Sequence, residues 1–228
     1  MRVMYDNHVF DETVAASTED ANFPLTNITT SRVLSDVFKM TATSGTITVT
    51  GSSLRADYAC IIGCNATSAS VNGEAFACTG GVDLIYFTSS TTTTWTFTFS
   101  GSANIEIAGL WIGEYTQMPI MNPGQTIVLS DADRIDTSLS GQVYIYELAE
   151  LRLKEYLVQF PYMTTEQKEE LEAYWLSWAH RQVIVDVWEE SNIQDPFYAY
   201  QTLTPIQISR TGSHNQPWSS NLIFRETK

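Results

Sequence analysis

The clearest pattern in the chain is an alternation of aromatic residues with threonines. Trp95, Phe97 and Phe99 are separated by single threonines, so an extended strand places the aromatics on one face and the threonines on the other. Other segments of the first half are also rich in β-branched and aromatic residues, with Gly, Ser, Asn and Asp between them. The predicted strands are Val37–Met40, Thr46–Thr50, Tyr58–Ile62, Val82–Phe87, Thr93–Phe99 and Ile105–Ile112. Short strands at this spacing predict a mainly β fold that begins with a jelly-roll-like β-sandwich.

The second half contains one segment with helical periodicity. Its apolar residues fall on one helix face: Leu171, Tyr174, Trp175, Trp178 and Ala179. Thr164 is a good N-cap, and Gln167 stands three residues later, where its side chain completes a capping box. We therefore expect an amphipathic helix over residues 164–181 that packs on a sheet, with Trp175 and Trp178 as core residues.

Predicted strands flank this helix on both sides. The alternating apolar residues are Leu151, Leu153 and Leu157 before the helix, and Val183, Val185 and Val187 after it. The further predicted strands are Thr126–Leu129, Gln142–Tyr146, Phe197–Thr202, Ile206–Ile208 and Leu222–Phe224. We expect Gln142–Tyr146 to form a hairpin with Leu151–Phe160.

The strongest interruption of these patterns lies between the two halves. Pro119, Pro123 and Gly124 fall within a few residues of one another, and such a segment continues neither a helix nor a central strand. We place a domain boundary there. The expected organisation is a β-sandwich domain over residues 1–117 and a β-rich domain with one helix over residues 118–228.

The net charge of the chain limits the classes of partner that it can bind. The chain has 12 Lys and Arg against 26 Asp and Glu, a formal net charge of −14. A surface of this sign repels phosphate backbones and anionic lipids, so we expect no specific nucleic-acid binding. The first residues contain no apolar signal-peptide core, and no apolar run approaches the ~20 residues of a spanning helix. We therefore expect no membrane insertion, and synthesis in a cytoplasm.

Two groups of residues are candidate metal ligands. The three cysteines, Cys60, Cys64 and Cys78, have no histidine nearby to complete a zinc site, so we expect free, mostly buried thiols. Asp131, Asp133 and Asp136 form an acidic cluster, but a calcium loop that starts at Asp131 needs Gly at its sixth position and Glu at its twelfth. Those positions hold Asp136 and Gln142. We expect no metal and no cofactor.

No catalytic constellation emerges from the remaining residues. The chain has three histidines, His8, His180 and His214, and it has neither a Gly-x-Ser-x-Gly elbow nor a phosphate-binding Gly-Lys-Ser/Thr loop. Glu189 and Glu190 are adjacent, and neighbouring residues of a strand point to opposite faces, so they do not make a glycosidase pair. We expect no catalytic residue and a protein that is not an enzyme.

Candidate contact residues lie in an irregular segment and near the end of the sandwich. The segment Glu12–Ser35 contains Phe23, Leu25 and Arg32, and a loop this long is usually functional or wrapped over a surface. Trp111 and Tyr115 are candidate stacking platforms for a sugar. Trp111 also continues the alternation of Ile105 and Ile107, which favours core or domain-interface packing over a sugar-binding role.

Several fragments together carry a resemblance to a known family. They are Phe23–Ile28 with Arg32, Tyr58–Asn65, Ile107–Gly113, Trp218–Leu222 and Phe224–Glu226. In these fragments the chain resembles structural tail proteins of tailed bacteriophages, whose N-terminal domain is a β-sandwich. The resemblance implies a non-enzymatic virion protein of the tail or tail tip. Such a protein is made in the host cytoplasm and assembles into a symmetric ring with copies of itself and other tail proteins.

Two other readings stay open. Similar sandwiches occur in carbohydrate-binding modules, so the alternative is a module that recognises a host cell-surface glycan. A hydrolase of the cell envelope is a third and weaker interpretation, because no catalytic motif supports it.

Overall fold

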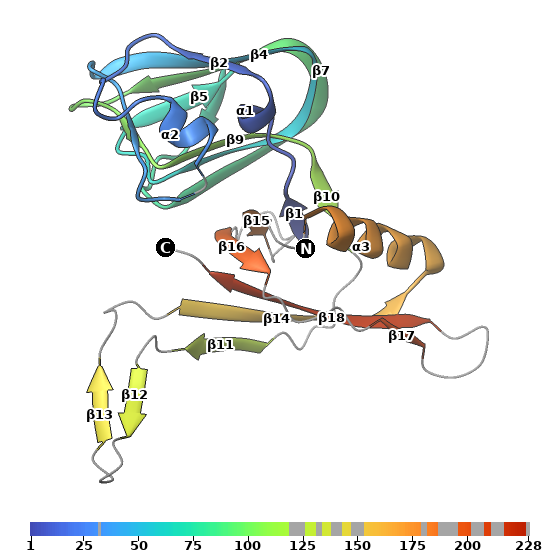
Figure 1. The fold of residues 1–228 in the computed structure, drawn as a ribbon. Coiled ribbons are helices and arrows are strands. Elements are labelled where there is room, and N and C mark those ends of the chain that lie inside the picture. The colour runs from blue at the N-terminus through green and yellow to red at the C-terminus, as the bar shows by residue number, and fades with distance from the viewer. Residues whose placement is uncertain are drawn as a thin grey trace. The chain divides into compact units, whose positions relative to one another are not determined.

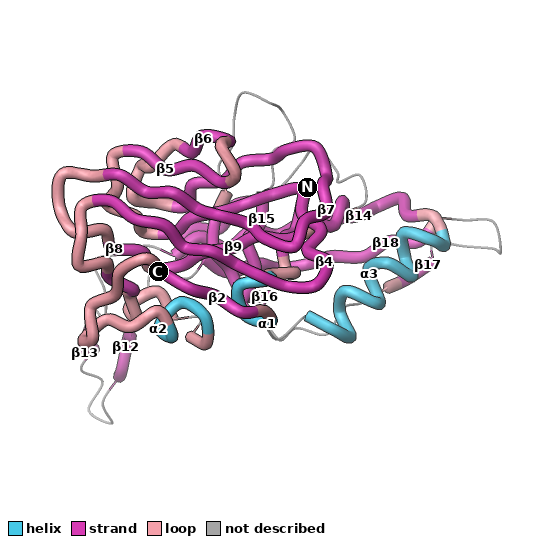
Figure 2. The backbone as a smooth tube through the Cα atoms, turned by 90° about the horizontal axis from the view of Figure 1, so that it is seen from above, coloured by secondary structure: helices cyan, strands magenta, loops and turns pink. Residues whose placement is uncertain are grey.

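The computed structural model is mainly β and divides into two compact units (Figures 1 and 2). It describes residues 1–31, 33–118, 126–130, 134–137, 143–146, 153–178, 182–186, 196–201, 208–210 and 217–226. The sandwich unit comprises Arg2–Gln117 and Ile184–Phe197. The helix unit comprises Met1, Met118–Val183 and Tyr198–Lys228. The expected assignment of domains to residues 1–117 and 118–228 stays a prediction.

The main sheet of the sandwich unit has the order β2-β4-β7-β5-β6, with β9 also paired to β4. Its strands are β2 (Thr13–Ala16), β4 (Ser44–Ile62), β5 (Ser68–Val71), β6 (Glu74–Phe76), β7 (Val82–Ser100) and β9 (Gly109–Gly113). A small second sheet pairs β3 (Phe38–Lys39) with β8 (Glu106–Ile107). All the pairings in both sheets are antiparallel, as expected for a β-sandwich.

The long strands β4 and β7 organise this unit. They pair from Ser44↔Ser100 to Ile62↔Val82, with register shifts after Thr50 and after Ala56. Such irregularities bend a strand, and Figure 1 shows both strands curving across the unit. The sequence predicted two separate strands within each of them. That prediction was wrong because the Ser- and Thr-rich stretches between the apolar segments remain extended and paired.

The core confirms the predicted alternation. Trp95, Phe97 and Phe99 are all buried. They belong to one apolar cluster together with Ile47, Val49, Ala59, Ile61, Leu110, Ile112, Phe38, Met40, Ile105 and Ile107. The helices α1 (His8–Asp11) and α2 (Thr26–Thr29) supply Val9 and Ile28 to the same cluster. The sandwich therefore has a continuous apolar interior.

The segment Glu12–Ser35 is more regular than expected. Its first part forms β2, which pairs with β4 from Thr13↔Thr50 to Ala16↔Ile47. Its middle forms α2, where Ile28 is buried. Elements of four residues are too short to produce a readable hydrophobic period, which is why the sequence indicated a loop. Through β2 and α2, the segment packs against the sandwich of its own chain.

A ribbon of three neighbouring strands belongs to the sandwich unit, except for the first two residues of its last strand. In it β1 (Arg2–Met4) lies between β10 (Tyr115–Gln117) and β15 (Gln182–Asp186), antiparallel to both. Val3 is opposite Thr116 on one side and Val185 on the other. The expected alternation in β15 was wrong, because its last four residues are all buried. Consecutive burial is typical of a strand that is covered on both faces.

The sheet of the helix unit has the order β16-β18-β14-β11. Its strands are β11 (Thr126–Ser130), β14 (Leu153–Met163), β16 (Phe197–Gln201) and β18 (Trp218–Glu226), and β17 (Ser209–Arg210) pairs with β18. The predicted phase of β14 was wrong. Val158 and Phe160 are buried whereas Leu157 is half-buried, so the core face is the one opposite to that expected.

A separate hairpin follows β11 in the chain. It joins β12 (Arg134–Thr137) to β13 (Val143–Tyr146), with Ile135 opposite Ile145. The predicted hairpin of Gln142–Tyr146 with Leu151–Phe160 was wrong, since β14 pairs with β11 and β18 instead. Because the sequence around Asp136 is acidic, we expected a solvated loop there and did not predict β12.

The helix α3 (Thr165–Trp178) begins as predicted. The Thr164 N–H donates to Gln167 Oε1 at 3.0 Å, and the Gln167 N–H donates to Thr164 Oγ1 at 3.2 Å, which confirms the capping box. Leu171 and Tyr174 are buried, but Trp175 is only half-buried. The side chain of Trp178 and residues 179–181 lie outside the described part of the chain. The apolar stripe thus packs on β14 through its first half, and Trp175 is not a full core residue.

Candidate functional site

Asn7 fastens the N-terminal segment to the sandwich. Asn7 is only 2% exposed to solvent. The Nδ2 group donates to the Leu110 carbonyl at 3.0 Å, and Oδ1 accepts from the N–H groups of Ile112 at 3.1 Å and Val9 at 3.2 Å. Leu110 and Ile112 lie on β9, and Val9 lies on α1, whose N-cap is Asn7. One amide therefore satisfies backbone groups of two elements.

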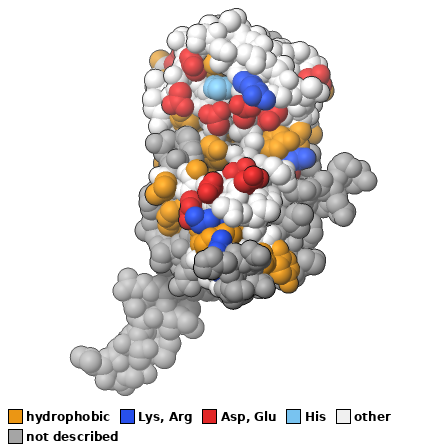
Figure 3. Space-filling view, turned by 90° about the vertical axis from the view of Figure 1, so that its right-hand side faces the viewer, with side chains coloured by type: hydrophobic (Ala, Val, Ile, Leu, Met, Phe, Trp, Pro, Cys, Tyr) orange, Lys and Arg blue, Asp and Glu red, His pale blue; other side chains and the backbone are white. Residues whose placement is uncertain are grey.

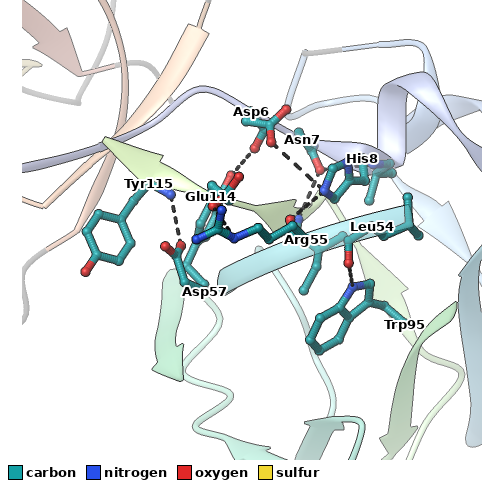
Figure 4. A network of polar contacts seen from close by, with 12 residues as sticks. Asp6, Asn7, His8, Leu54, Arg55, Asp57, Trp95, Glu114 and Tyr115 are labelled. Carbon is teal, nitrogen blue, oxygen red and sulfur yellow. Dashed lines mark hydrogen bonds and ion pairs between the residues drawn. The ribbon is translucent and has the colours of Figure 1, made fainter. Parts of the chain in front are cut away.

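A polar network surrounds this anchor (Figure 4). His8 Nε2 lies 2.8 Å from the Arg55 carbonyl oxygen and 4.0 Å from Asp6 Oδ2. Arg55 Nε donates to Glu114 Oε1 and to Ser89 Oγ, both at 3.0 Å. Every polar contact named here joins the N-terminal segment, β4, β7 or the end of β9. The arrangement holds strands together and presents no activated nucleophile.

A second cluster joins the ribbon to Tyr86 of β7. The Arg2 guanidinium sits 4.2 Å from the centre of the Tyr86 ring and 5.0 Å from that of Tyr115. The Tyr86 hydroxyl donates to Asp186 Oδ2 at 2.7 Å. Burial, together with this hydrogen bond, raises the pKa of Tyr86 well above its ordinary value. The phenol therefore stays protonated and acts as a fixed donor.

The residues proposed as contacts from sequence are scattered. Phe23 is 39% exposed, with the Lys39 ammonium 5.6 Å from its ring centre. Leu25 is 9% exposed and packs in the core, and Arg32 lies outside the described residues. Trp111 is 2% exposed and meets Phe10 edge-on, with 5.7 Å between the ring centres.

Tyr115 is half-buried, and its ring meets Tyr86 at 5.3 Å between centres. The structure supports core packing of Trp111, because its enclosed indole offers no face to a sugar. Leu25 is enclosed in the same way and offers no surface to a partner. Phe23 and Tyr115 stay predicted contacts.

The thiols are free, as expected. Cys60 and Cys64 are buried and Cys78 is half-buried. Burial raises the pKa of Cys64 to about 12 and also raises that of Cys78. Within the described ranges, no group of three His, Cys, Asp or Glu side chains could hold a metal ion.

Several other sequence candidates lie outside the described residues. They are Asp131, Asp133, His180, Glu189, Glu190 and His214. Asp136 is in β12, opposite Tyr144. In the part of the chain that the structure describes, no helix is long and apolar enough to span a membrane.

A groove in the helix unit is the best candidate binding site. We call it the α3 groove; it has a volume of about 430 Å³, and the described residues that line it are Glu172, Trp175 and Leu176 of α3 and Ile208, which precedes β17. Leu176 is 83% exposed although it is apolar. In both Figures 1 and 2, α3 runs beside β17 and β18.

Among the described residues that line the α3 groove, Glu172 is the charged one, and it is paired with a lysine of the same helix. The Lys168 ammonium donates to Glu172 Oε2 at 2.6 Å and lies 5.3 Å from the centre of the Trp218 ring. The Arg210 guanidinium lies 4.2 Å from the same ring centre. Sequence reasoning missed this site, because α3 and β17 are far apart along the chain. Trp175 was predicted from the sequence, but as a core residue of the helix stripe and not as part of a surface groove.

No family model and no curated protein matches the sequence. Among solved structures, the chain is similar to chitosan-binding module 1 from a chitosanase/glucanase of Paenibacillus sp. IK-5. That alignment has 17% identity, a TM-score of 0.41, and covers 47% of this chain and 98% of the module. CpGH89CBM32-4 of Clostridium perfringens aligns with 16% identity and a TM-score of 0.37, over 48% of this chain and 99% of that one.

The tail of an empty GTA particle is a further similar structure. It shows 16% identity and a TM-score of 0.30, and the alignment covers 51% of this chain and 84% of that chain. These neighbours are β-rich, and carbohydrate-binding modules predominate over tail proteins among the similar structures. At this level of similarity they assign no function.

Proposed function

We propose that the chain is a non-enzymatic structural subunit of a bacteriophage virion, in the tail or tail tip, that forms a ring with its copies and other tail proteins. The observation that carries the proposal is the β12–β13 hairpin. It is a two-stranded sheet of its own, and Figure 1 draws it projecting beyond β11 and β14 of the same unit.

A hairpin of this kind is incomplete by itself. Two strands alone are marginally stable in water, and a third strand or a packed face is needed to hold them. Among the described strands, β12 and β13 pair only with each other. Their outer edges therefore offer backbone donors and acceptors that a strand of a neighbouring subunit can satisfy.

Charge sets a condition on this assembly. The net charge is −14, and acidic side chains are the commonest charged groups on the face shown in Figure 3. Like-charged copies repel one another at low salt, so a template or a different tail protein is needed to bring them together. The virion setting itself rests on the sequence resemblance to tail proteins.

The test replaces Arg134–Tyr146 by a short Gly-Ser linker. We expect the purified variant to keep the melting temperature of the natural protein, because the hairpin adds little stability, and to be absent from particles. The control inserts four Gly and Ser residues at the Asn72–Gly73 turn, where the positive φ angles of 45° and 94° mark a hairpin tip in the sandwich unit. The control should enter particles normally.

Two results would overturn the proposal. One is incorporation of the linker variant at the natural level. The other is loss of the folded state in that variant, which would show that the hairpin stabilises its own unit and does not serve a neighbour.

A carbohydrate-binding role is the second candidate. From the sequence, Trp111 and Tyr115 were the candidate sugar-stacking residues, but Trp111 is enclosed. The observation that now favours it is the α3 groove, where the Trp175 indole lies beside the Glu172 carboxylate.

A further inference from the structure

Two of the three cysteines lie together in the sandwich unit. Cys64 follows β4 and belongs to the apolar core, and Cys78 follows β6 and packs against that core. A hydrogen bond joins their two thiol groups. The third cysteine, Cys60, is fully buried within β4, and its thiol donates to the Ile61 carbonyl at 3.8 Å. The thiols that lie next to each other are therefore those of Cys64 and Cys78.

The turn after Cys78 is held by a buried carboxylate. Asp83 is 6% exposed, and its two oxygens accept from the Thr79 hydroxyl at 2.7 Å and from the Thr79 N–H at 2.9 Å. Thr79 is the residue directly after Cys78, and Asp83 belongs to β7. These bonds therefore anchor the backbone beside Cys78 to a central strand of the main sheet.

The end of β4 runs beside this turn. The Gly63 N–H donates to the Gly81 carbonyl at 2.9 Å, which continues the pairing of β4 with β7. The Cys64 sulfur accepts from the Ala66 N–H at 3.4 Å. Both cysteines thus stand on neighbouring, hydrogen-bonded segments, an arrangement in which a disulfide needs little movement of the backbone.

Exposure and acidity assign different roles to the two thiols. Cys64 is 2% exposed, whereas Cys78 is half-buried. Burial raises the pKa of both thiols, and the hydrogen bond between them raises the pKa of Cys64 and lowers that of Cys78. Because the thiolate is the attacking species and must reach the oxidant, Cys78 reacts first and Cys64 second.

We propose that Cys64 and Cys78 are a modification site, oxidised to a disulfide by a small-molecule disulfide when the protein leaves a reducing cytoplasm. The Cys78 thiolate attacks one sulfur of the oxidant, which forms a mixed disulfide and releases one small thiol. Cys64 then gives its proton to solvent and attacks the Cys78 sulfur, which releases the second small thiol. The protein loses two electrons and two protons, and the oxidant gains both. The site needs an oxidising medium and does not depend on the virion role.

The disulfide closes residues 64–78 into a loop that contains β5 and β6. Among the described strands, β6 pairs only with β5, beside which it runs at one edge of the main sheet (Figure 2). The bond therefore fastens a short edge strand to the end of β4. It also restricts the unfolded chain, so the oxidised protein should melt about 6 to 12 °C above the reduced protein.

The experiment incubates the reduced full chain with oxidised glutathione at about pH 8.5, where more of the thiol is ionised. We expect the intact mass to fall by two hydrogens, with no glutathione retained. The free thiols of the unfolded chain should fall from three to one. Peptide mapping without reductant should join Cys64 to Cys78, and dithiothreitol should reverse each change.

Single substitutions separate the two roles. Cys64→Ala keeps the attacking thiol and removes its partner, so this variant should accumulate a glutathione adduct on Cys78. Cys78→Ala leaves the enclosed thiol alone and should react at least about tenfold more slowly than Cys64→Ala. The matched control is Cys60→Ala, which removes a buried cysteine outside the pair and should form the disulfide at the natural rate.

Three outcomes would overturn the proposal. They are three free thiols after prolonged oxidation, a disulfide that contains Cys60 or joins two chains, and an oxidised protein that melts at or below the temperature of the reduced protein. All three are measured on the natural protein, so they decide the question even where a variant fails to fold. Failure of the assembly role would be seen separately, as normal incorporation of the hairpin variant.

Discussion

Replacing Asn7 by alanine should destabilise the sandwich unit more than any other single change to a polar side chain named above. The amide makes three buried hydrogen bonds, with Leu110, Ile112 and Val9. Each is worth about 1 kcal/mol net, and a buried group left without a partner costs more. The expected loss is therefore about 3 kcal/mol or more, which lowers the melting temperature by about 6 to 12 °C in a protein of this size.

The assay is thermal and urea unfolding, followed by tryptophan fluorescence. Asn65→Ala is the matched control: Asn65 also bonds two backbone groups, the Asn104 carbonyl at 3.0 Å and the Glu106 N–H at 2.9 Å, but it is exposed. Water replaces those bonds, so the control should lose less than about 1 kcal/mol. Equal losses in the two variants, or a loss below about 1 kcal/mol for Asn7→Ala, would refute the anchoring role.

Three further changes test other parts of the fold. Gln167→Ala removes half of the capping box and should cost about 0.5 to 1 kcal/mol in urea unfolding, whereas exposed Glu169→Ala should cost less; equal costs would contradict the capping role. Ile28→Ala should cost about 2 to 4 kcal/mol, because Ile28 is part of the core, and a loss under about 0.5 kcal/mol would show that α2 is not anchored. Cys64 should make unfolding pH-dependent between pH 9 and about 12, since the unfolded thiol ionises first and the stabilisation from the neutral folded thiol is lost as the pH rises. Cys64→Ala should remove that part of the slope, and an unchanged slope would exclude it.

Local spacing predicted those features that depend on near neighbours. The aromatic residues from Trp95 to Phe99 alternate with the period of a strand, and the structure buries all three. Thr164 and Gln167 form their capping box because its geometry spans only three residues. The mainly β class followed from the same local signals.

Features that depend on pairing between distant segments were not predictable in the same way. Nothing in the sequence of Gln142–Tyr146 distinguishes pairing with β12 from pairing with β14, because a partner strand is chosen by the packing of the whole unit. The phase of β14 failed for a related reason, since both faces of its sequence carry apolar residues such as Leu157 and Val158. The α3 groove needs α3 and β17 to lie side by side, so it appeared only in the structure.

We propose that this chain is a structural component of a virion. Quantitative mass spectrometry of purified particles tests it most directly, because a ring subunit must be present in a fixed number of copies in every particle. We expect peptides from both units at a constant ratio to the major tail protein, in several copies per particle. Absence of the chain from intact, infectious particles, or a trace amount that falls with further purification, would contradict it.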